Sequence, residues 1–191
     1  MKDLILNNLK NCAGTRINID LIQIMDEVKG NFLEIGAGFG LMTKHFGKLA
    51  LNYDRKVLVI DPFEEGWEDM PESYKYAYST YQASIRECED AIILHKKSSL
   101  DASVPRFIKK YLPIGFAFVD GLQYKEAVLS DLRMMEKFKA KIICVDDIER
   151  TTGESQVPEA VKEFLETSEY VQVVPEEPLR EGYFVHKSDY T

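Results

Sequence analysis

The sequence predicts an α/β protein built on one doubly wound sheet, with five parallel strands followed by a C-terminal antiparallel hairpin. Short apolar runs alternate with segments of helical periodicity, a glycine-rich turn follows the first of these runs, and the last two runs lie too close together for a helical crossover. Continuous apolar strands separated by helices are typical of a parallel sheet covered on both faces. Two strands joined by a short loop pair antiparallel.

The expected elements follow from these patterns. Strands are predicted at 32–35, 56–60, 91–95, 114–119 and 141–145, with the hairpin strands at 170–174 and 182–186. Apolar residues at helical spacing predict helices at 20–28, 42–49, 125–138 and 157–165. Pro158 falls in the first turn of the last helix, where its missing N–H leaves no hydrogen bond unmade.

Length and composition indicate one domain, 1–191, of ordinary globular type. Residues 1–30 are expected to form a helical cap over the ligand pocket. Residues 63–90, rich in tyrosine, are expected to form a lid segment, and the alternative there is an ordinary amphipathic helix with exposed tyrosines. The net charge of −8, without a basic stripe, argues against a nucleic-acid partner. No apolar run approaches the roughly 18 residues of a membrane span. Three unpatterned cysteines fit a reducing, cytoplasmic compartment.

The turn after the first strand carries the strongest functional signal. Glu34 ends the apolar run, and glycines follow at 36, 38 and 40. Glycine lets ligand atoms approach the backbone, and the helix that follows points free N–H groups into the turn. The dinucleotide fingerprint needs a third small residue at position 41, where this chain has Leu41. An acidic residue before the glycines suits a cationic ligand. A turn that merely packs is the alternative.

Acidic residues also end three other strands. Asp61 follows the second strand, where a carboxylate can accept hydrogen bonds from ribose hydroxyls or cap the turn before Pro62. Asp120, Asp146 and Asp147 follow the fourth and fifth strands. If these two strands are adjacent in the sheet, the three carboxylates converge and repel one another unless a cation lies between them, and Mg²⁺ prefers oxygen ligands. The alternative is a turn or helix cap at 146–147 and a lone cofactor contact at 120.

Several stretches resemble one enzyme family. The Glu-x-Gly-x-Gly-x-Gly pattern looks like the first motif of the class I S-adenosylmethionine (SAM) methyltransferases, which have a Rossmann-like fold. The stretches VLVIDPFEEGWEDMP (57–71), FVDGLQYKEAVLSDL (118–132) and IICVDD (142–147) resemble the macrocin-type sugar O-methyltransferases. Together the motifs extend from about residue 31 to residue 184.

The resemblance implies SAM as cofactor and a site at the carboxyl edge of the sheet. The implied cofactor-binding residues are Glu34, Gly36, Ala37, Gly38, Gly40, Asp61, Pro62, Ser98, Ser99 and Asp120. In the family, the acidic residues matching Asp120, Asp146 and Asp147 hold Mg²⁺. The implied reaction is metal-assisted methyl transfer to a hydroxyl of a small molecule, of sugar or phenol type. The short chain leaves room for a homodimer partner to complete the site.

One position departs from the family pattern. The usual histidine three residues after the strand 4 aspartate is Gln123 here, and glutamine cannot take a proton at neutral pH. Gln123 would then only bind the substrate, and Lys125, His45 and His186 are other titratable candidates. The open alternatives are a base elsewhere, catalysis by metal and proximity alone, and a SAM-binding protein without activity. A nicotinamide-dependent oxidoreductase is a third class, disfavoured by Leu41.

Overall fold

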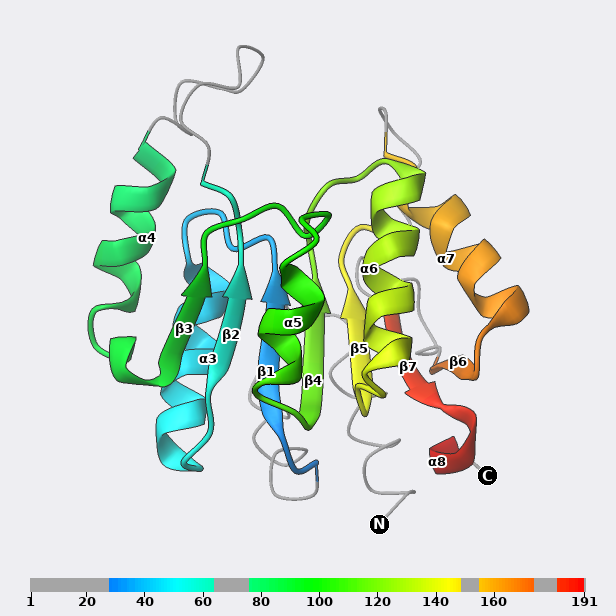
Figure 1. The fold of residues 1–191 in the computed structure, drawn as a ribbon, viewed down its shortest axis with the longest axis horizontal. Helices are drawn as coiled ribbons and strands as arrows, with labels where there is room; N and C mark the ends of the chain where they lie inside the picture. Colours follow the sequence, from blue (N-terminus) through cyan, green and yellow to red (C-terminus); the bar gives the residue numbers. More distant parts are fainter. Residues whose placement is uncertain (1–27, 64–75, 149–154, 174–181, 191) are drawn as a thin grey trace.

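A seven-stranded sheet forms the centre of the molecule, in the order β3-β2-β1-β4-β5-β7-β6 (Figure 1). The computed structural model describes residues 28–63, 76–148, 155–173 and 182–190. The strands are β1 (Asn31–Ile35), β2 (Val57–Ile60), β3 (Ile92–His95), β4 (Ile114–Val119), β5 (Ile142–Val145), β6 (Tyr170–Val173) and β7 (Gly182–His186). Strands β1 to β5 are parallel, and β7 pairs antiparallel with both β5 and β6. The predicted fold class is therefore confirmed.

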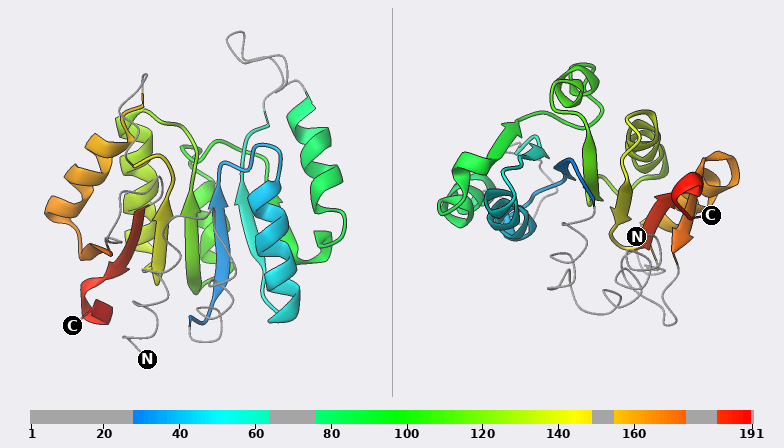
Figure 2. Two further views of the ribbon diagram at one scale, coloured as in Figure 1. Left: turned by 180° about the vertical axis from the view of Figure 1, so that it is seen from behind. Right: turned by 90° about the horizontal axis from the view of Figure 1, so that it is seen from below.

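Helices cover both faces of this sheet (Figure 2). Those in the described ranges are α3 (Leu41–Asn52), α4 (Ala77–Ile85), α5 (Val104–Lys109), α6 (Lys125–Lys137), α7 (Val157–Thr167) and α8 (Lys187–Tyr190), together with the 3₁₀ turn η2 (Glu89–Ala91). Helices α3 and α4 share one apolar cluster with the sheet, and α5, α6 and α7 share the other. This is the doubly wound arrangement that the alternation of strands and helices predicts.

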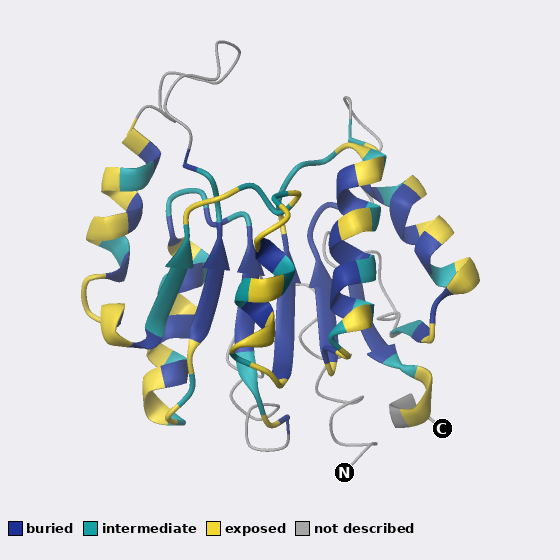
Figure 3. Ribbon diagram, viewed as in Figure 1, coloured by how far each residue is buried: buried dark blue, intermediate teal, exposed yellow. Residues whose placement is uncertain are grey.

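Burial explains why the strand runs are continuously apolar. Every residue of β2, β4 and β5 is buried, so both faces of these strands are covered (Figure 3). Successive side chains of β1 point to opposite faces: Phe32 stacks on Phe46 of α3 at a centroid distance of 5.3 Å, and Leu33 joins the opposite cluster. Because β1 to β5 are parallel, their carboxyl ends lie at the same edge of the sheet.

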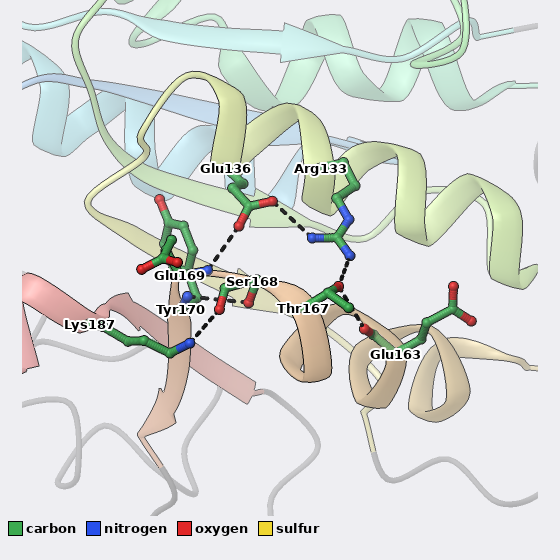
Figure 4. Close-up of polar contacts among 8 residues, drawn as sticks. All are labelled: Arg133, Glu136, Glu163, Thr167, Ser168, Glu169, Tyr170 and Lys187. Atoms are coloured by element: carbon green, nitrogen blue, oxygen red, sulfur yellow. Dashed lines mark hydrogen bonds and ion pairs between the residues drawn. The ribbon is translucent and has the colours of Figure 1, made fainter.

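Polar contacts join the terminal hairpin to α6 (Figure 4). Glu136 accepts a hydrogen bond from Arg133 on the same helix at 2.9 Å and another from the backbone N–H of Glu169 at 3.0 Å. Lys187 donates to the carbonyl oxygen of Ser168 at 2.5 Å. The hairpin is thereby held against the helix layer, away from the edge that carries the acidic strand ends.

Three of the described α-helices were not predicted as such, α4, α5 and the four-residue α8. Helix α5 has only six residues with a proline in its first turn, too short for a periodic signal. Helix α4 lies within the predicted lid segment, of which 64–75 lie outside the described residues. The predicted helix 20–28 and cap 1–30 lie outside them as well, except for residues 28–30. Within the described ranges, no helix is both long and apolar enough to cross a bilayer.

Candidate functional site

The glycine turn between β1 and α3 is shaped by three positive φ angles, 84° at Gly36, 50° at Gly38 and 78° at Gly40. A Cβ at Gly36 would lie 2.0 Å from the carbonyl oxygen of Asp120, and one at Gly40 would lie 2.9 Å from the Tyr81 ring. At Gly38 nothing lies within 4 Å of that position. Packing therefore requires the first and third glycines, whereas the middle glycine borders open space.

Asp61 braces this turn from the end of β2. Its Oδ2 accepts hydrogen bonds from the backbone N–H groups of Ala37 at 2.7 Å and Gly38 at 3.1 Å. Its Oδ1 accepts from the N–H of Phe63 at 2.8 Å, so Asp61 also caps the turn around Pro62, as the alternative interpretation predicted. The contact with the glycine turn was not predicted. Because a carboxylate offers about four acceptor positions, Asp61 retains capacity for a ligand hydroxyl.

Glu34 is a completely buried carboxyl at the end of β1. Its Oε2 accepts a hydrogen bond from the Thr43 hydroxyl at 2.5 Å, and Oε1 has no partner among the described residues. Burial raises the pKa of Glu34 to about 8; the Thr43 hydrogen bond opposes this rise, and Asp120 and Asp61 add to it. A cation beside Glu34 would favour its ionised form.

Tyr81 of α4 is a neighbour of the turn that the sequence did not single out as a site residue. Its ring lies against Gly40, and within the described structure its buried hydroxyl has no hydrogen-bond partner. Burial raises the pKa of this hydroxyl, with Glu34 as the next contributor, so it stays protonated. The tyrosine-rich composition of 63–90 was the sole sequence signal.

The ends of β4 and β5 are adjacent, as predicted. Asp120 is exposed, whereas Asp146 and Asp147 are buried, and Asp147 has a φ of 59°. Gln123 donates from Nε2 to Oδ2 of Asp147 at 2.8 Å. No group of three or more His, Cys, Asp or Glu side chains in the described part of the chain is arranged to hold a metal. The predicted magnesium site is therefore not supported.

The titratable candidates for a base differ in their distance from position 123 along the chain and in their partners. Lys125 forms an ion pair with Glu163 of α7 at 2.7 Å, and this hydrogen bond raises the pKa of Lys125. His186 follows Val185, which pairs with Ile142 at the start of β5, so His186 lies at the edge of the sheet opposite to the carboxyl ends of the parallel strands. Its Nδ1 is 2.8 Å from the Ser188 hydroxyl. His45 is exposed on α3. His45 and His186 therefore lie on other elements than Gln123, and Lys125, two residues away, has its ammonium group held by Glu163.

The loop from β3 to α5 carries the two predicted serines. The Ser98 hydroxyl accepts a hydrogen bond from the N–H of Leu100 at 3.3 Å, which closes a local turn. His95 Nε2 lies 2.9 Å from the hydroxyl of Ser103, which donates to Asp101 at 2.6 Å. Hydrogen bonds among the loop's own residues therefore close it, and Ser99 lies within the segment that they enclose.

Comparison with known proteins identifies solved structures that share this fold. No protein-family model and no curated protein sequence matches the chain. Among solved structures, the TDP-rhamnose 3′-O-methyltransferase CalS11 of calicheamicin biosynthesis is 16% identical, with a TM-score of 0.58, covering 96% of this chain and 93% of its own. The O-methyltransferase TomG from Streptomyces achromogenes, in complex with SAM, is 14% identical, with a TM-score of 0.58, over 97% and 78% of the two chains.

The O-methyltransferase from Bacillus cereus, in complex with S-adenosylhomocysteine (SAH), is also 14% identical, with a TM-score of 0.57, over 97% of this chain and 89% of that one. At these identities the likeness concerns the fold. The chain therefore has the class I methyltransferase fold, the class that the glycine turn and the strand order also indicate. Its activity has to be argued from the site.

Proposed function

We propose that this protein is a SAM-dependent methyltransferase that binds its cofactor across the ends of β1 and β2. The observation that carries the proposal is the open space over Gly38, whose backbone N–H donates to the carboxylate of Asp61, with the buried carboxyl of Glu34 at the end of the preceding strand. Open α/β sheets bind ligands at the carboxyl ends of their strands. The fold shared with SAM- and SAH-bound O-methyltransferases adds support.

The electrostatics of the turn favour SAM over a dinucleotide. A pyrophosphate normally binds to free N–H groups of a glycine-rich turn. Here the N–H groups of Ala37 and Gly38 already donate to Asp61. The carboxyl groups of Asp61 and Asp120 also act on Glu34. The carboxyl groups around the turn would repel a phosphate and attract the sulfonium and ammonium groups of SAM.

The acceptor we propose is a hydroxyl group of a small molecule, of sugar or phenol type. The hydroxyl oxygen would attack the methyl carbon in line, the carbon–sulfur bond would break to release SAH, and the hydroxyl proton would pass to water. Proximity and orientation supply much of the acceleration in such a transfer. Gln123 cannot accept the proton, so its contribution is to hold Asp147.

A divalent metal has no step in this mechanism. The three aspartates that the family resemblance assigns to Mg²⁺ differ in exposure, with Asp120 exposed and Asp146 and Asp147 buried. The amide of Gln123 also donates to an Asp147 oxygen that a cation would need as a ligand. These residues, as they are arranged, do not fit a magnesium ion.

A SAM-binding protein without transferase activity is the second candidate. The hydrogen bond from Gln123 to Asp147 favours this candidate, because position 123 carries an amide where the macrocin-type family that the sequence resembles carries a histidine. Turnover separates the two candidates. Radiolabelled methyl transfer from SAM to a panel of sugars and phenols would support the enzyme, and tight SAM binding without transfer to any of them would support the binding protein.

Calorimetric titration with SAM, SAH and NAD tests the cofactor assignment. We expect micromolar binding of SAM and SAH and none of NAD. A Gly38→Val variant should lose at least tenfold in SAM affinity because its side chain occupies the open space, whereas Leu51→Ala, exposed on α3, should bind as the parent does. Binding of NAD, or equal SAM affinity in both variants, would contradict the assignment. The homodimer and the cytoplasmic location stay predictions; sedimentation tests the first.

A further inference from the structure

The amino edge of the sheet, opposite the proposed cofactor pocket, is rich in lysine. The segments 28–30, 52–56, 109–113 and 138–141 lead into β1, β2, β4 and β5 there, at the foot of the sheet in Figure 1. Exposed lysines in these segments define what we call the basic edge: Lys29, Lys56, Lys109, Lys110, Lys139 and Lys141. The same segments contain one acidic residue, Asp54, although the whole chain has a net charge of −8. Positive charge is therefore concentrated at the edge opposite to the acidic strand ends.

Backbone hydrogen bonds place these segments side by side. The N–H of Asn31 donates to the carbonyl oxygen of Pro113 at 2.9 Å, and Oδ1 of Asn31 accepts from the N–H of Lys56 at 2.9 Å. On the other side of β4, the N–H of Lys141 donates to the carbonyl oxygen of Ile114 at 3.2 Å. Lys56 and Lys141 thus precede strands that are three spacings apart in the sheet, or about 14 Å. The sequence shows no basic stripe because only the fold brings these segments together.

Local structure accounts for part of the basic edge. Cations near the C-terminus of a helix interact favourably with its dipole, which explains Lys109 at the end of α5 and Lys139 just past α6. Lys56 and Lys141 precede strands and have no such role. Among the described residues, no carboxylate forms an ion pair with Lys29, Lys109 or Lys139. Like charges gathered in this way repel one another, so an anionic partner would relieve the repulsion.

The composition of the basic edge favours a lipid surface as that partner. All its members are lysines, which act as point charges, whereas arginine supplies the bidentate geometry that recognises single carboxylates and phosphates. Lysine is also depleted in interfaces between proteins. Leu112, which is 41% exposed, follows Lys110 and precedes β4, so an apolar side chain lies among the charges. Clusters of about four to eight basic residues bind anionic lipid headgroups.

We propose that the basic edge is a membrane-facing surface, through which the protein binds peripherally to anionic phospholipid headgroups. Such binding needs no membrane-spanning helix. The six residues of β4 extend over about 20 Å, which exceeds the Debye length of about 8 Å at physiological salt, so the acidic strand ends oppose the attraction little. The proposed cofactor pocket would face away from the lipid. This inference does not depend on which ligand that pocket binds.

Sedimentation of the full-length protein with lipid vesicles tests the inference. The vesicles contain about 30% phosphatidylglycerol in phosphatidylcholine, and pure phosphatidylcholine is the matched neutral surface. We expect binding to the anionic vesicles alone, and its loss in about 0.5 M salt, where the Debye length is about 4 Å. The double variant Lys109→Gln, Lys110→Gln should bind about 25-fold more weakly, at about fivefold for each lysine.

The matched control is the double variant Lys96→Gln, Lys97→Gln, an exposed lysine pair after β3 at the opposite edge. It should bind within about threefold of the parent, because its charges lie beyond the Debye length from the lipid. Unchanged unfolding temperatures check the fold of both variants. Absent binding, equal binding to pure phosphatidylcholine, or an equal loss in the two variants would overturn the inference. Tighter binding to a DNA duplex than to the anionic vesicles would also overturn it, and each of these results leaves the cofactor assignment intact.

Discussion

The two halves of the carboxyl edge carry similar numbers of carboxyl groups and use them differently. Around β1 and β2, Asp61 holds the glycine turn through backbone N–H groups, and space remains open above Gly38. Around β4 and β5, Asp147 is held by the side chain of Gln123. In the first half no described atom lies within 4 Å of the Cβ position of Gly38, and in the second Gln123, which is bonded to Asp147, also lines a small cavity with Asp120 and Asp146. Cofactor binding should therefore depend on the first half, and folding on both.

The largest effect is expected at Gly36. A Gly36→Ala side chain would meet the Asp120 backbone at 2.0 Å, so we expect a loss of at least about 3 kcal/mol in the free energy of unfolding. Gly38→Ala meets no atom within 4 Å, and its positive φ alone should cost about 1 kcal/mol. Denaturant unfolding measures both. Equal losses would show that the two glycines do not differ in their surroundings.

Glu34→Gln should separate stability from binding. The pKa of Glu34 is raised from its ordinary value of 4.5 to about 8 in the folded protein, so the folded state retains a proton that the unfolded state loses. This contribution to stability is fully present below about pH 4.5 and is lost as the pH rises toward 8, which amounts to about 3 kcal/mol by pH 7.

The Gln variant should therefore be more stable than the parent at pH 7 and equal to it near pH 4, when unfolding is followed across this range. Its SAM affinity should fall about tenfold, because the carboxylate that attracts the cation is gone. Thr43→Val, which removes the hydrogen bond to Glu34, serves as a comparison. A Gln variant that unfolds with the same pH dependence as the parent would refute the assigned ionisation.

Gln123→Glu tests the other half of the edge. It sets a second carboxylate in place of an amide that lies 2.8 Å from Asp147, so the two groups should repel. We expect a loss of about 1–3 kcal/mol in the free energy of unfolding at pH 8, smaller at pH 5, where protonation relieves the repulsion. SAH affinity should stay within threefold of the parent. A tenfold loss of SAH affinity would show that the two halves are coupled.

The smallest effect is expected at Lys125. Its partner Glu163 is half exposed, and ion pairs at the surface contribute little to stability. Lys125→Met should leave the unfolding temperature and SAH affinity unchanged within error, and methyl transfer as well, if turnover is detected. A large loss of turnover with unchanged SAH binding would instead assign Lys125 a place in the reaction.

Much of the fold could be predicted because its signals are local. The strands β2, β4 and β5 are buried on both faces and therefore read as unbroken apolar runs. The 13 residues of α6 repeat their apolar positions over several turns, whereas α5 has six residues and no such repeat. The bounds of the predicted elements differ from the observed ones mostly by one to three residues at their ends, as expected where helices and strands fray.

The site was predictable in its residue types and less so in their partners. That Asp61 would lie near the glycine turn followed from its place after the second strand, but its hydrogen bonds to Ala37 and Gly38 did not. The convergence of Asp120, Asp146 and Asp147 on a metal was inferred from adjacent strand ends. Adjacency of β4 and β5 is confirmed, and the metal group is not found among the described residues. Strand order does not determine where each side chain points.

The sequence by itself determined the α/β class, the parallel sheet with its terminal hairpin, and a glycine turn suited to a cationic ligand. These depend on the periodicity of neighbouring residues and on the conformational freedom of glycine. Only the tertiary structure decided that space remains open at Gly38 among the described residues, that Glu34 is buried with a raised pKa, and that Gln123 holds Asp147. The physical reason is distance along the chain: Asp61 and Ala37 are 24 residues apart, as are Gln123 and Asp147, and burial and pairing arise only once the sheet brings such residues together.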